Sequence, residues 1–410
     1  RFRDADGQLV DPLLKGICKA GLPAQTCRTD YLDIAAQAVA SNLYYDRAKT
    51  NRPKRILTYE EAIKGISDKD GINGISRVTS PGYPWSQMPH KGKGKTHWMG
   101  HNDWDFTSNG ALELRQFVDE QEILIRNGQR LDVIWIDTLK DEVLPRPKVA
   151  IEKPSVFSNG PMHYTILFRK YFMMFMAHVM DNRISNEITV GIDPNSIEWQ
   201  MLSDKITSKG PKVFDGDFAQ YDGTLVAKIL WKILDIINDW YDDGPTNRLA
   251  RTTLWNDIVH SVHSCRGYLY QWTHSIPSGC PITAIVNSIY NSLSMRVVFL
   301  ETSPIKSMKY FEENVAMASY GDDNIVNISD EVAPTFNQVV AAEGYKRIGM
   351  TYTDADKESE LRPYKTIDEI SFLKRYWRKD EYLGFYGAPS TLSSRLDILN
   401  WTRTDTNTDP

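Results

Sequence analysis

The sequence predicts an α+β fold, in which helices and strands mix without the strict alternation of a βαβ protein. Alternating phenylalanine and aspartate side chains predict a strand at residues 213–218, and apolar side chains at helical spacing predict a helix over residues 225–240. A second helix comes next, from near residue 281, and a β-hairpin at residues 315–328 comes after it. These elements do not repeat with a βαβ rhythm.

The first strand and the two helices have clear boundary signals. The strand places Asp215 and Asp217 on the face opposite to its phenylalanines. The helix after it should stop at the Gly-Pro pair 244–245. The second helix should begin near Pro281, because proline suits the first turn of a helix.

The later elements are shorter. The hairpin at residues 315–328 has a Gly-Asp-Asp turn at 321–323, so its tip is acidic. Residues 336–345 fit an amphipathic helix, and residues 370–377 alternate between apolar and basic side chains, as a final hairpin would. The most apolar stretch, residues 171–180, has about half the length needed to cross a bilayer, so we expect no transmembrane segment.

Composition excludes some classes of protein. The chain has 410 residues, with 48 Lys and Arg against 53 Asp and Glu, and therefore a formal net charge of −5. Its 25% charged and 41% hydrophobic residues are typical of a globular protein and exclude wholesale disorder. The mild acidity argues against a simple basic nucleic-acid coat, but it is compatible with a basic channel inside an acidic exterior. Two basic clusters, at residues 47–55 and 91–95, are either solvated loops or contacts with a polyanion.

The cysteines and the start of the chain suggest a cellular context. The four cysteines form no Cys-x-x-Cys pair and have no zinc-type spacing with histidine, so we expect reduced thiols in an intracellular protein. No secretory signal opens the chain, and its first residue is Arg1 rather than methionine. We therefore expect a processed piece of a longer precursor or a cloned fragment.

Three aspartates are candidates for a metal site. Asp217 lies at the end of the first strand, and Asp322 and Asp323 lie at the hairpin tip. Brought together at strand ends, they would repel one another unless cations neutralised them, and their hard oxygens suit Mg²⁺. Two such ions about 4 Å apart can activate an attacking hydroxyl and stabilise a leaving pyrophosphate. The alternative is that the acidic tip is an ordinary solvated turn.

The second helix adds a polar stripe. Thr283, Asn287 and Asn291 lie at i, i+4 and i+8 on an otherwise apolar helix, and the loop before it contains a glycine that permits close approach of a ligand. Asp222 could join Ser278 and Asn287 in recognising a ribose 2′-hydroxyl, the group that distinguishes RNA from DNA precursors. The alternative is a buried polar network that holds the helix to the strand.

Together these segments resemble the motifs of viral RNA-dependent RNA polymerases. The matching segments, in chain order, are TSPGYPW at 79–85 (motif G), KDE at 140–142 (the start of motif F), DFAQYDG at 217–223 (motif A), PSGC at 277–280 with Thr283 and Asn287 (motif B), YGDD at 320–323 (motif C), MTYTDADK at 350–357 (motif D) and FLKR at 372–375 (motif E). The order is that of the family, and the resemblance covers roughly residues 79–378. The form of motif G and GIDP at 191–194 are similar to the picornavirus-like group, with the insect dicistroviruses and iflaviruses nearest.

The resemblance implies a role for each matching residue. Asp217 and Asp322 would hold two Mg²⁺ ions, with Asp323 assisting, and Mn²⁺ could take the place of Mg²⁺. Lys357 would protonate the leaving pyrophosphate, although an exposed structural lysine is the alternative. The residues implied in substrate binding are Asp222, Ser278, Gly279, Thr283, Asn287, Lys140, Arg146, Lys148 and Lys153. Those implied in RNA binding are Ser80, Gly82, Tyr83 and Pro84 along the template and Lys374 and Arg375 on the primer.

The resemblance also implies a right-hand polymerase architecture, with a palm built on an antiparallel sheet flanked by helices. The expected divisions are fingers at 1–189, palm at 190–245, a fingers insertion at 246–275, palm at 276–380 and a truncated thumb at 381–410.

One residue departs from the family pattern. Ser155 stands where relatives have an arginine that contacts the incoming triphosphate, and serine cannot supply that charge. Arg146 or Lys148 could compensate for it.

Three functions remain open on the sequence. The first is an RNA-directed RNA polymerase of a positive-strand RNA virus, with RNA template and primer and ribonucleoside triphosphates as substrates. A reverse transcriptase is less favoured, because Asp222 and Asn287 invite the 2′-hydroxyl where deoxynucleotide-selecting enzymes generally place a bulky ring. The third is a polymerase-like RNA-binding module that has lost catalysis. The resemblance further implies a small viral protein primer and other viral replication proteins as partners, at membrane-associated replication complexes in the host cytoplasm.

Overall fold

The computed structural model describes residues 2–3, 9–23, 25–66, 72–141, 155–356, 360–382 and 384–399. Two four-stranded sheets organise these residues. The first sheet has the strand order β10 (Thr351–Asp354), β5 (Lys212–Ala219), β9 (Asp323–Ile328) and β8 (Val315–Tyr320). All of its pairings are antiparallel, which confirms the predicted strand at 213–218 and the predicted hairpin at 315–328.

Helices pack against this first sheet and against one another. They are α2 (Thr29–Tyr44), α8 (Glu198–Ile206), α10 (Ala227–Tyr241), α12 (Thr283–Thr302), α13 (Met308–Asn314) and α14 (Gln338–Arg347). Helix α12 is buried along nearly its whole length because it lies between β8, α14, α10 and α2. Its polar stripe is therefore inside the protein rather than on its surface.

Two prolines have roles that differ from the predicted ones. The Gly-Pro pair 244–245 does not stop α10, which ends at Tyr241 because Asp242 adopts a left-handed conformation with φ 47°. Pro245 instead opens the next helix, α11 (Pro245–Val259). Helix α12 begins near Pro281 as predicted, but Pro281 lies just before its N-cap and not in its first turn.

The second sheet joins segments that are far apart in the sequence. Its strand order is β4 (Val156–Asn159), β3 (Ile134–Leu139), β6 (Val262–Cys265) and β7 (Tyr268–Gln271). The β3–β6 pairing is parallel, whereas β3–β4 and β6–β7 are antiparallel. This mixed sheet confirms the predicted α+β class, since neither sheet is built from successive βαβ units.

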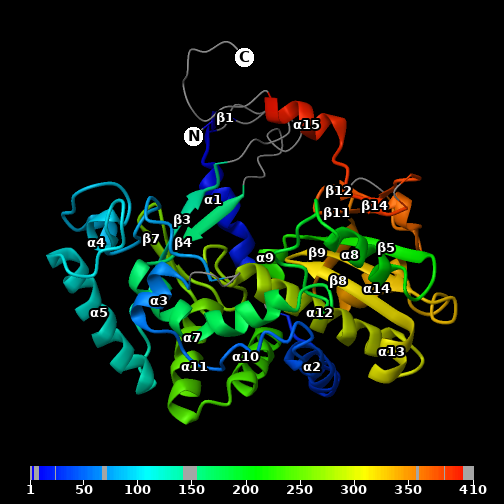
Figure 1. Cartoon of the computed structure of the whole chain (residues 1–410), viewed down its shortest axis with the longest axis horizontal. Helices are drawn as coiled ribbons and strands as arrows, with labels where there is room; N and C mark the ends of the chain where they lie inside the picture. Colours follow the sequence, from blue (N-terminus) through cyan, green and yellow to red (C-terminus); the bar gives the residue numbers. More distant parts are fainter. Residues whose placement is uncertain are drawn as a thin grey trace.

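Further helices pack against one another in the part of the chain that contains the second sheet. They are α3 (Tyr59–Lys64), α4 (Thr96–Met99), α5 (Asn109–Arg126) and α7 (Met162–Asp181), together with α11. Helix α7 contains the apolar stretch 171–180 and is buried almost throughout, so these residues form core. No helix among the described residues is long and apolar enough to span a bilayer. Figure 1 shows α3, α4, α5 and α11 on one side of the molecule and β5, β8, β9, α13 and α14 on the other.

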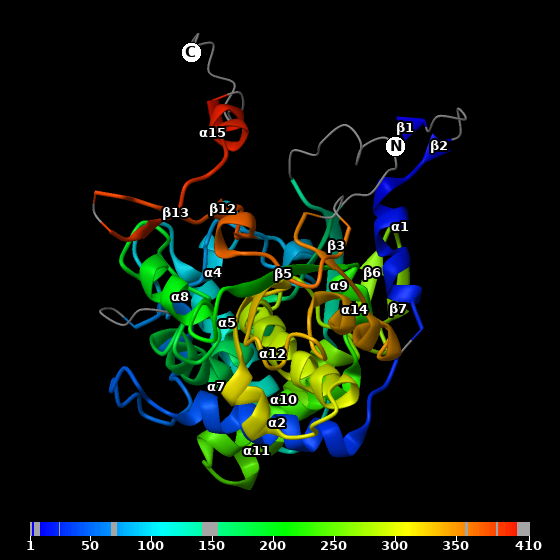
Figure 2. The same cartoon turned by 90° about the vertical axis from the view of Figure 1, so that its right-hand side faces the viewer.

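The remaining elements lie at the two ends of the chain and beside the sheets. They are β1 (Phe2–Arg3), β2 (Leu9–Val10), α1 (Pro12–Ile17), η1 (Cys18–Gly21), η2 (Trp85–Gln87), α9 (Tyr221–Thr224), η3 (Ile367–Glu369), β11 (Ser371–Phe372), β12 (Arg375–Tyr376), β13 (Arg378–Lys379), β14 (Tyr386–Gly387) and α15 (Leu392–Leu399). Helix α1 packs beside β3 and β4, and Figure 2 shows α15 standing apart above the sheets. The pair β11–β12 confirms the predicted hairpin at 370–377.

Candidate active site

The first sheet brings the predicted aspartates to one edge. In the β5–β9 register, Gly216 pairs with Asn324, so Asp217 comes opposite Asp323 when the register continues by one residue. Asp323 also closes the β8–β9 hairpin by pairing with Tyr320. Strand pairing alone therefore places motif A beside the acidic hairpin turn, although about a hundred residues separate them in the sequence.

Side chains of helix α12 form hydrogen bonds with the backbone of the hairpin turn. The Asn291 side-chain amide donates to the carbonyls of Gly321 at 3.3 Å and Asp322 at 3.1 Å. The N–H of Gly321 donates to Ser288 Oγ at 2.8 Å, and Gly321 has φ 64°, which glycine adopts without strain. The third residue of the predicted polar stripe thus supports the carboxylates through the turn backbone.

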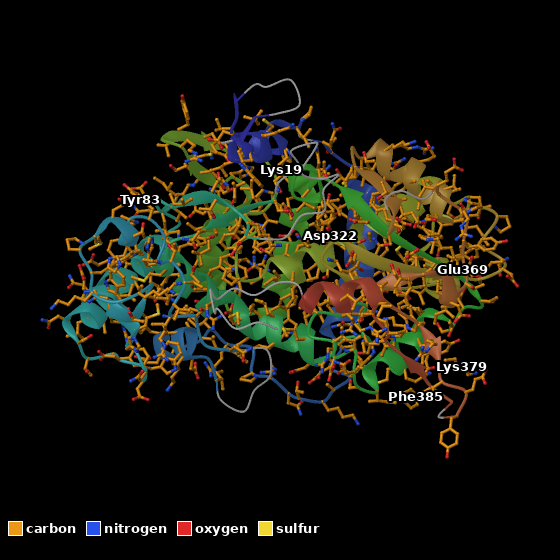
Figure 3. The ribbon with its side chains drawn as sticks, turned by 90° about the horizontal axis from the view of Figure 1, so that it is seen from above. Lys19, Tyr83, Asp322, Glu369, Lys379 and Phe385 are labelled. Atoms are coloured by element: carbon orange, nitrogen blue, oxygen red, sulfur yellow. The ribbon has the colours of Figure 1, made fainter. Side chains whose placement is uncertain are left out.

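The donor set suits a hard cation that also binds substrate. Asp217 is buried, with its carboxylate accepting from the Phe218 N–H at 2.6 Å, whereas Asp322 is exposed and Asp323 is half-buried. Within the described ranges, no three His, Cys, Asp or Glu side chains lie close enough to form a metal site by themselves. The three aspartates are therefore not a preformed cage. Mg²⁺ fits such a site, because it is usually held by one or two carboxylates and completed by water and substrate phosphates. In Figure 3, Asp322 lies near the middle of the molecule.

The loop before α12 packs against β4. The Ser158 N–H donates to Ser278 Oγ at 3.3 Å, and a Cβ on Gly279 would come within 2.0 Å of the Ser158 carbonyl. Thr283 Oγ1 donates to the carbonyls of Pro277 at 3.1 Å and Cys280 at 2.8 Å, so it closes the loop. Only glycine at position 279 permits the loop to come this close to the Ser158 carbonyl of β4.

The three residues predicted to recognise ribose are not joined to one another. Asp222 and Ser278 line one small cavity, whereas Asn287 is buried and its side-chain oxygen has no hydrogen-bond partner. Asp222 instead forms an ion pair with Lys19, with 3.0 Å between Lys19 Nζ and Asp222 Oδ2. These three side chains form no hydrogen bonds with one another, and the Asn287 oxygen keeps an unused acceptor. Ser278 does bond to β4 and Asn291 to the β8–β9 turn, as expected of a polar network that holds the helix to the strands.

The chain is similar to known proteins in both sequence and fold. A family model described as viral RNA-dependent RNA polymerase matches residues 3–409. The chain belongs to this family. It is similar to the replicase polyproteins of Cricket paralysis virus, at 42% identity over 98% of this chain and 24% of that protein, and of Drosophila C virus, at 39% over 97% and 24%. It is also similar to the genome polyprotein of Deformed wing virus, at 30% over 96% of this chain and 14% of that protein.

These relatives confirm the resemblance to the dicistrovirus and iflavirus polymerases. The chain spans about a quarter or less of the length of the polyproteins it matches. Its fold is similar to that of a Sicinivirus 3Dpol RNA dependent RNA polymerase, with a TM-score of 0.80 and 21% identity over 97% of this chain and 78% of that one. The right-hand polymerase architecture expected from the motifs is therefore confirmed.

A buried network beside the polymerase motifs was not predicted. Asp137 Oδ1 accepts from Ser158 Oγ at 2.7 Å and bonds to His263 Nδ1 at 2.9 Å, and Asp137 Oδ2 accepts from the Tyr270 hydroxyl at 2.5 Å. His263 is fully buried and stacks on Trp272. The network joins β3, β4, β6 and β7, so it supports the strand on which the motif B loop rests. Its residues come from distant segments and share no local pattern that could have identified them.

Motif G lies along a larger cavity of about 440 Å³. Ser80 and Gly82 line it with residues of β3, β4 and the motif B loop. Ser80 Oγ accepts from the Gly82 N–H at 3.2 Å and from the Asn159 amide at 3.1 Å, while Tyr83 is exposed and Pro84 is half-buried. Tyr83 lies at one side of the molecule in Figure 3. The cavity separates the motif G loop from the motif B loop.

The motif G tryptophan is structural. Trp85 is buried and donates from Nε1 to His163 Nδ1 on α7 at 2.8 Å. Burial lowers the pKa of His163 to about 3, so this histidine stays neutral and accepts the bond.

Acid should therefore destabilise the protein through His163. Its pKa is 6.5 in an unfolded chain and about 3 in the folded one, so the unfolded state binds the proton more readily. The stabilising contribution is complete above pH 6.5 and is lost as the pH falls toward 3. Between pH 7 and pH 5 the loss should be about 2 kcal/mol.

The matched variant is His163→Gln, because its amide oxygen can accept from Trp85 and does not titrate. Urea unfolding at the two pH values should show the wild type losing about 2 kcal/mol more than this variant. Equal losses in the two proteins would contradict the assignment.

A second unpredicted cluster joins motifs A, D and E. Lys365 Nζ lies 2.7 Å from Asp215 Oδ1 and 2.6 Å from Asp354 Oδ2, and all three side chains are buried. The Ser371 N–H, at the start of the motif E hairpin, donates to Asp215 Oδ2 at 2.9 Å. Burial raises the pKa of Asp215 despite Lys365. Asp354 is the last residue of β10, inside motif D and three residues before Lys357, so the cluster anchors the motif D strand.

The remaining predicted residues have mixed outcomes. Lys374 is exposed in the β11–β12 turn, whereas Arg375 donates to the Ala388 carbonyl at 3.1 Å. Lys140 is exposed, and its N–H donates to the Ser155 carbonyl at 2.9 Å. Four predicted residues lie outside the described ranges: Arg146, Lys148, Lys153 and Lys357.

Parts of the two basic clusters are structural. Arg52 pairs with Asp181, and Arg55 pairs with Glu61. Lys95 is buried, where it donates to the Thr79 hydroxyl at 2.6 Å, and burial lowers its pKa to about 8. Arg52 and Lys95 are therefore shielded cations that stabilise the fold near α7 and motif G, whereas Arg55 lies in an exposed ion pair at the surface.

Proposed function

We propose that this chain is an RNA-directed RNA polymerase that replicates the genome of a positive-strand RNA virus. It would transfer a nucleotide from a ribonucleoside triphosphate to the 3′-hydroxyl of an RNA primer paired with an RNA template. The main support is the meeting of Asp217 with the Asp322-Asp323 turn at one sheet edge. Membership of the viral polymerase family supports the same proposal.

Each step of the proposed reaction would depend on particular residues of the chain. Asp217 and Asp322, assisted by Asp323, would hold two Mg²⁺ ions, which when bound activate the attacking hydroxyl and stabilise the leaving pyrophosphate. Asn291 would keep the turn carboxylates in place through the turn backbone. Lys357 would donate a proton to pyrophosphate, and Lys374 would contact primer phosphates.

Nucleotide choice would depend on polar groups around the ribose. Asp222 and the side-chain oxygen of Asn287 can accept from a 2′-hydroxyl, and Ser278 can both donate and accept. A deoxynucleotide would leave the buried Asn287 acceptor unpaired, which costs binding energy. This feature favours an RNA polymerase over a reverse transcriptase.

The domain and partner assignments belong to the same proposal. The mixed sheet would lie in the fingers (1–189 and 246–275), the antiparallel sheet in the palm (190–245 and 276–380), and residues 381–410 in the thumb. We also propose a small viral protein primer and other viral replication proteins as partners, at membrane-associated complexes in the host cytoplasm. The likeness to replicase polyproteins supports only a role in viral replication.

One observation favours a second candidate, a polymerase-like RNA-binding module with impaired catalysis. Ser155 is exposed beside Lys140 at the end of the β3–β4 pair, where the family pattern places an arginine for the triphosphate. If the missing charge limits the reaction, Ser155→Arg should leave nucleotide incorporation equal or faster. Its carbonyl bond to Lys140 does not depend on the side chain, so the fold should tolerate the change.

Single-nucleotide incorporation by wild type and Ser155→Arg would check this. Ser155→Lys is the matched control, because it adds charge without a planar fork of donors. A severe loss of incorporation in the arginine variant would show that Ser155 does not face the triphosphate.

Primer extension on a defined RNA template tests the proposed function. The purified chain should extend an RNA primer with ribonucleotides when Mg²⁺ or Mn²⁺ is supplied, and much more slowly with deoxynucleotides. A preference for deoxynucleotides would indicate a reverse transcriptase. RNA binding without any extension would favour the binding module.

A further inference from the structure

An N-terminal lysine contacts the aspartate proposed to recognise ribose. Lys19 Nζ donates to Asp222 Oδ2 at 3.0 Å, across 203 positions of sequence. The two side chains are 19% and 37% exposed, so the pair is partly shielded from water and stays accessible to a ligand. Lys19 belongs to no polymerase motif, and nothing in its local sequence marks it as functional.

The backbone holds Lys19 in place. Lys19 lies in η1, and η1 packs against α9, the short helix that contains Asp222. A Cβ on Gly223 would come within 2.8 Å of the Lys19 carbonyl and 3.0 Å of its Cβ, so the contact requires glycine. The Leu22 N–H also donates to the Lys19 carbonyl at 3.2 Å. In Figure 3, Lys19 and Asp322 both lie in the central part of the molecule.

Lys19 pairs with Asp222 because Asp222 is the carboxylate that remains available in the small cavity lined by Asp222 and Ser278. Among the described residues that line this cavity, Lys19 is the one cation, and the carboxylates are Asp137 and Asp222. Both oxygens of Asp137 already bond to Ser158, His263 and Tyr270. The Asp222 carboxylate therefore receives the lysine charge.

The ion pair uses one half of the Asp222 carboxylate. Lys19 binds Oδ2, and Ser275 Oγ donates to the Asp222 carbonyl, so both the side chain and the backbone of Asp222 are fixed. No protein donor among the described residues bonds to Oδ1. An oriented carboxylate with one oxygen free is an acceptor for a hydroxyl group, and Ser278 lines the same cavity.

We propose that Lys19 is a positioning residue that sets the discrimination between ribonucleotides and deoxyribonucleotides by orienting Asp222. The inference rests on the proposed polymerase function. Lys19 does not touch the reacting atoms; it keeps the Asp222 carboxylate aligned for the ribose hydroxyl. A freely rotating Asp222 would lose much of the advantage of a nucleotide that carries this hydroxyl.

Single-nucleotide incorporation with each type of nucleotide tests the proposal. The readout is the ratio of kcat/KM for a ribonucleotide to that for the matching deoxynucleotide. Lys19→Met, which keeps the length of the side chain without its charge, should lower this ratio about tenfold, mainly by slowing the ribonucleotide. Lys19→Arg should keep the ratio within about threefold of wild type, because arginine can still pair with one carboxylate oxygen.

Two further variants separate positioning from general damage. Gly223→Ala displaces η1 without changing any charge and should lower the ratio in the same direction as Lys19→Met. Lys346→Met removes an exposed lysine that pairs with Glu343 on α14, and should leave the ratio unchanged.

The two proposals can fail separately. A wild-type chain that prefers ribonucleotides, with an unchanged ratio in Lys19→Met, would overturn the role of Lys19 and leave the polymerase intact. Equal slowing of both nucleotides in Lys19→Met would also overturn it, since that result indicates structural damage only. A wild-type chain that incorporates no nucleotide would overturn the proposed function and this inference with it.

Discussion

Asp322→Ala should lower nucleotide incorporation by at least about 1,000-fold. Asp322 is the exposed carboxylate of the β8–β9 turn, and its backbone carbonyl accepts from Asn291 whatever the side chain is. Alanine therefore removes one candidate metal ligand without removing the support of the turn. RNA affinity should stay within about twofold of wild type, because phosphate contacts depend on cations elsewhere.

Asp204→Ala is the matched control for this variant. Asp204 is an exposed aspartate on α8 that accepts from Gln200 at 2.6 Å, away from the sheet edge. Incorporation should be unchanged in this control. Substantial activity of Asp322→Ala in Mg²⁺ would contradict the proposed site, and lost RNA affinity would indicate a wider structural role for the turn.

Lys365→Met should lower the free energy of unfolding by about 3–5 kcal/mol. Methionine fills a similar volume but leaves Asp215 and Asp354 as two buried carboxylates without a cation. The hydrogen bonds from Ser371 and Gln338 remain, but neutral donors do not compensate for the lost charge. The loss should appear as a lower midpoint in urea unfolding.

The pH dependence of this loss identifies its cause. Burial already raises the pKa of Asp215, and removing Lys365 should raise it further. A folded state with a raised carboxyl pKa binds protons more readily than the unfolded state, so the variant should recover stability as the pH falls. Lys346→Met, at an exposed ion pair, should change stability by less than about 0.5 kcal/mol. A loss in Lys365→Met that is equally large at pH 5 and pH 8 would contradict this explanation.

The strands and the turn that carry the candidate metal-binding aspartates could be predicted, because each of them is marked by a local pattern in the sequence. The alternation at 213–218 and the acidic hairpin at 315–328 specify β5, β8 and β9, and pairing of these strands then brings Asp217 to the turn. The stripe on α12 was predicted from its spacing, and Asn291 does support the turn. The order of the motifs along the chain predicted the family, and the family match over residues 3–409 confirms it.

The contacts that fix the polar residues could not be predicted in this way. Lys19 meets Asp222, Asp137 meets His263, and Lys365 joins Asp215 to Asp354, all across more than ten positions of sequence. Such pairs depend on tertiary packing and leave no period or motif in a single sequence. The end of α10 was missed for a different reason, since a left-handed aspartate at position 242 replaced the expected glycine stop. The start of α12 near Pro281 was predicted correctly, but the proline lies before the N-cap.

The charge balance is explained by these same pairings. The net charge of −5 argued against a simple nucleic-acid coat. In the structure, buried or half-buried lysines and arginines such as Lys365, Arg52 and Lys19 neutralise carboxylates inside the protein. The aspartates at the sheet edge are the acidic group that the proposed metal ions would neutralise.

Template-directed choice of a ribonucleotide tests the central claim most directly. The wild-type chain, an RNA template–primer, Mg²⁺ and one nucleotide at a time should give extension only with the ribonucleotide complementary to the next template base. Changing that template base should change the incorporated ribonucleotide accordingly, and Asp322→Ala should abolish the signal. Extension that ignores the template, prefers deoxynucleotides, or fails in both Mg²⁺ and Mn²⁺ would contradict the assignment.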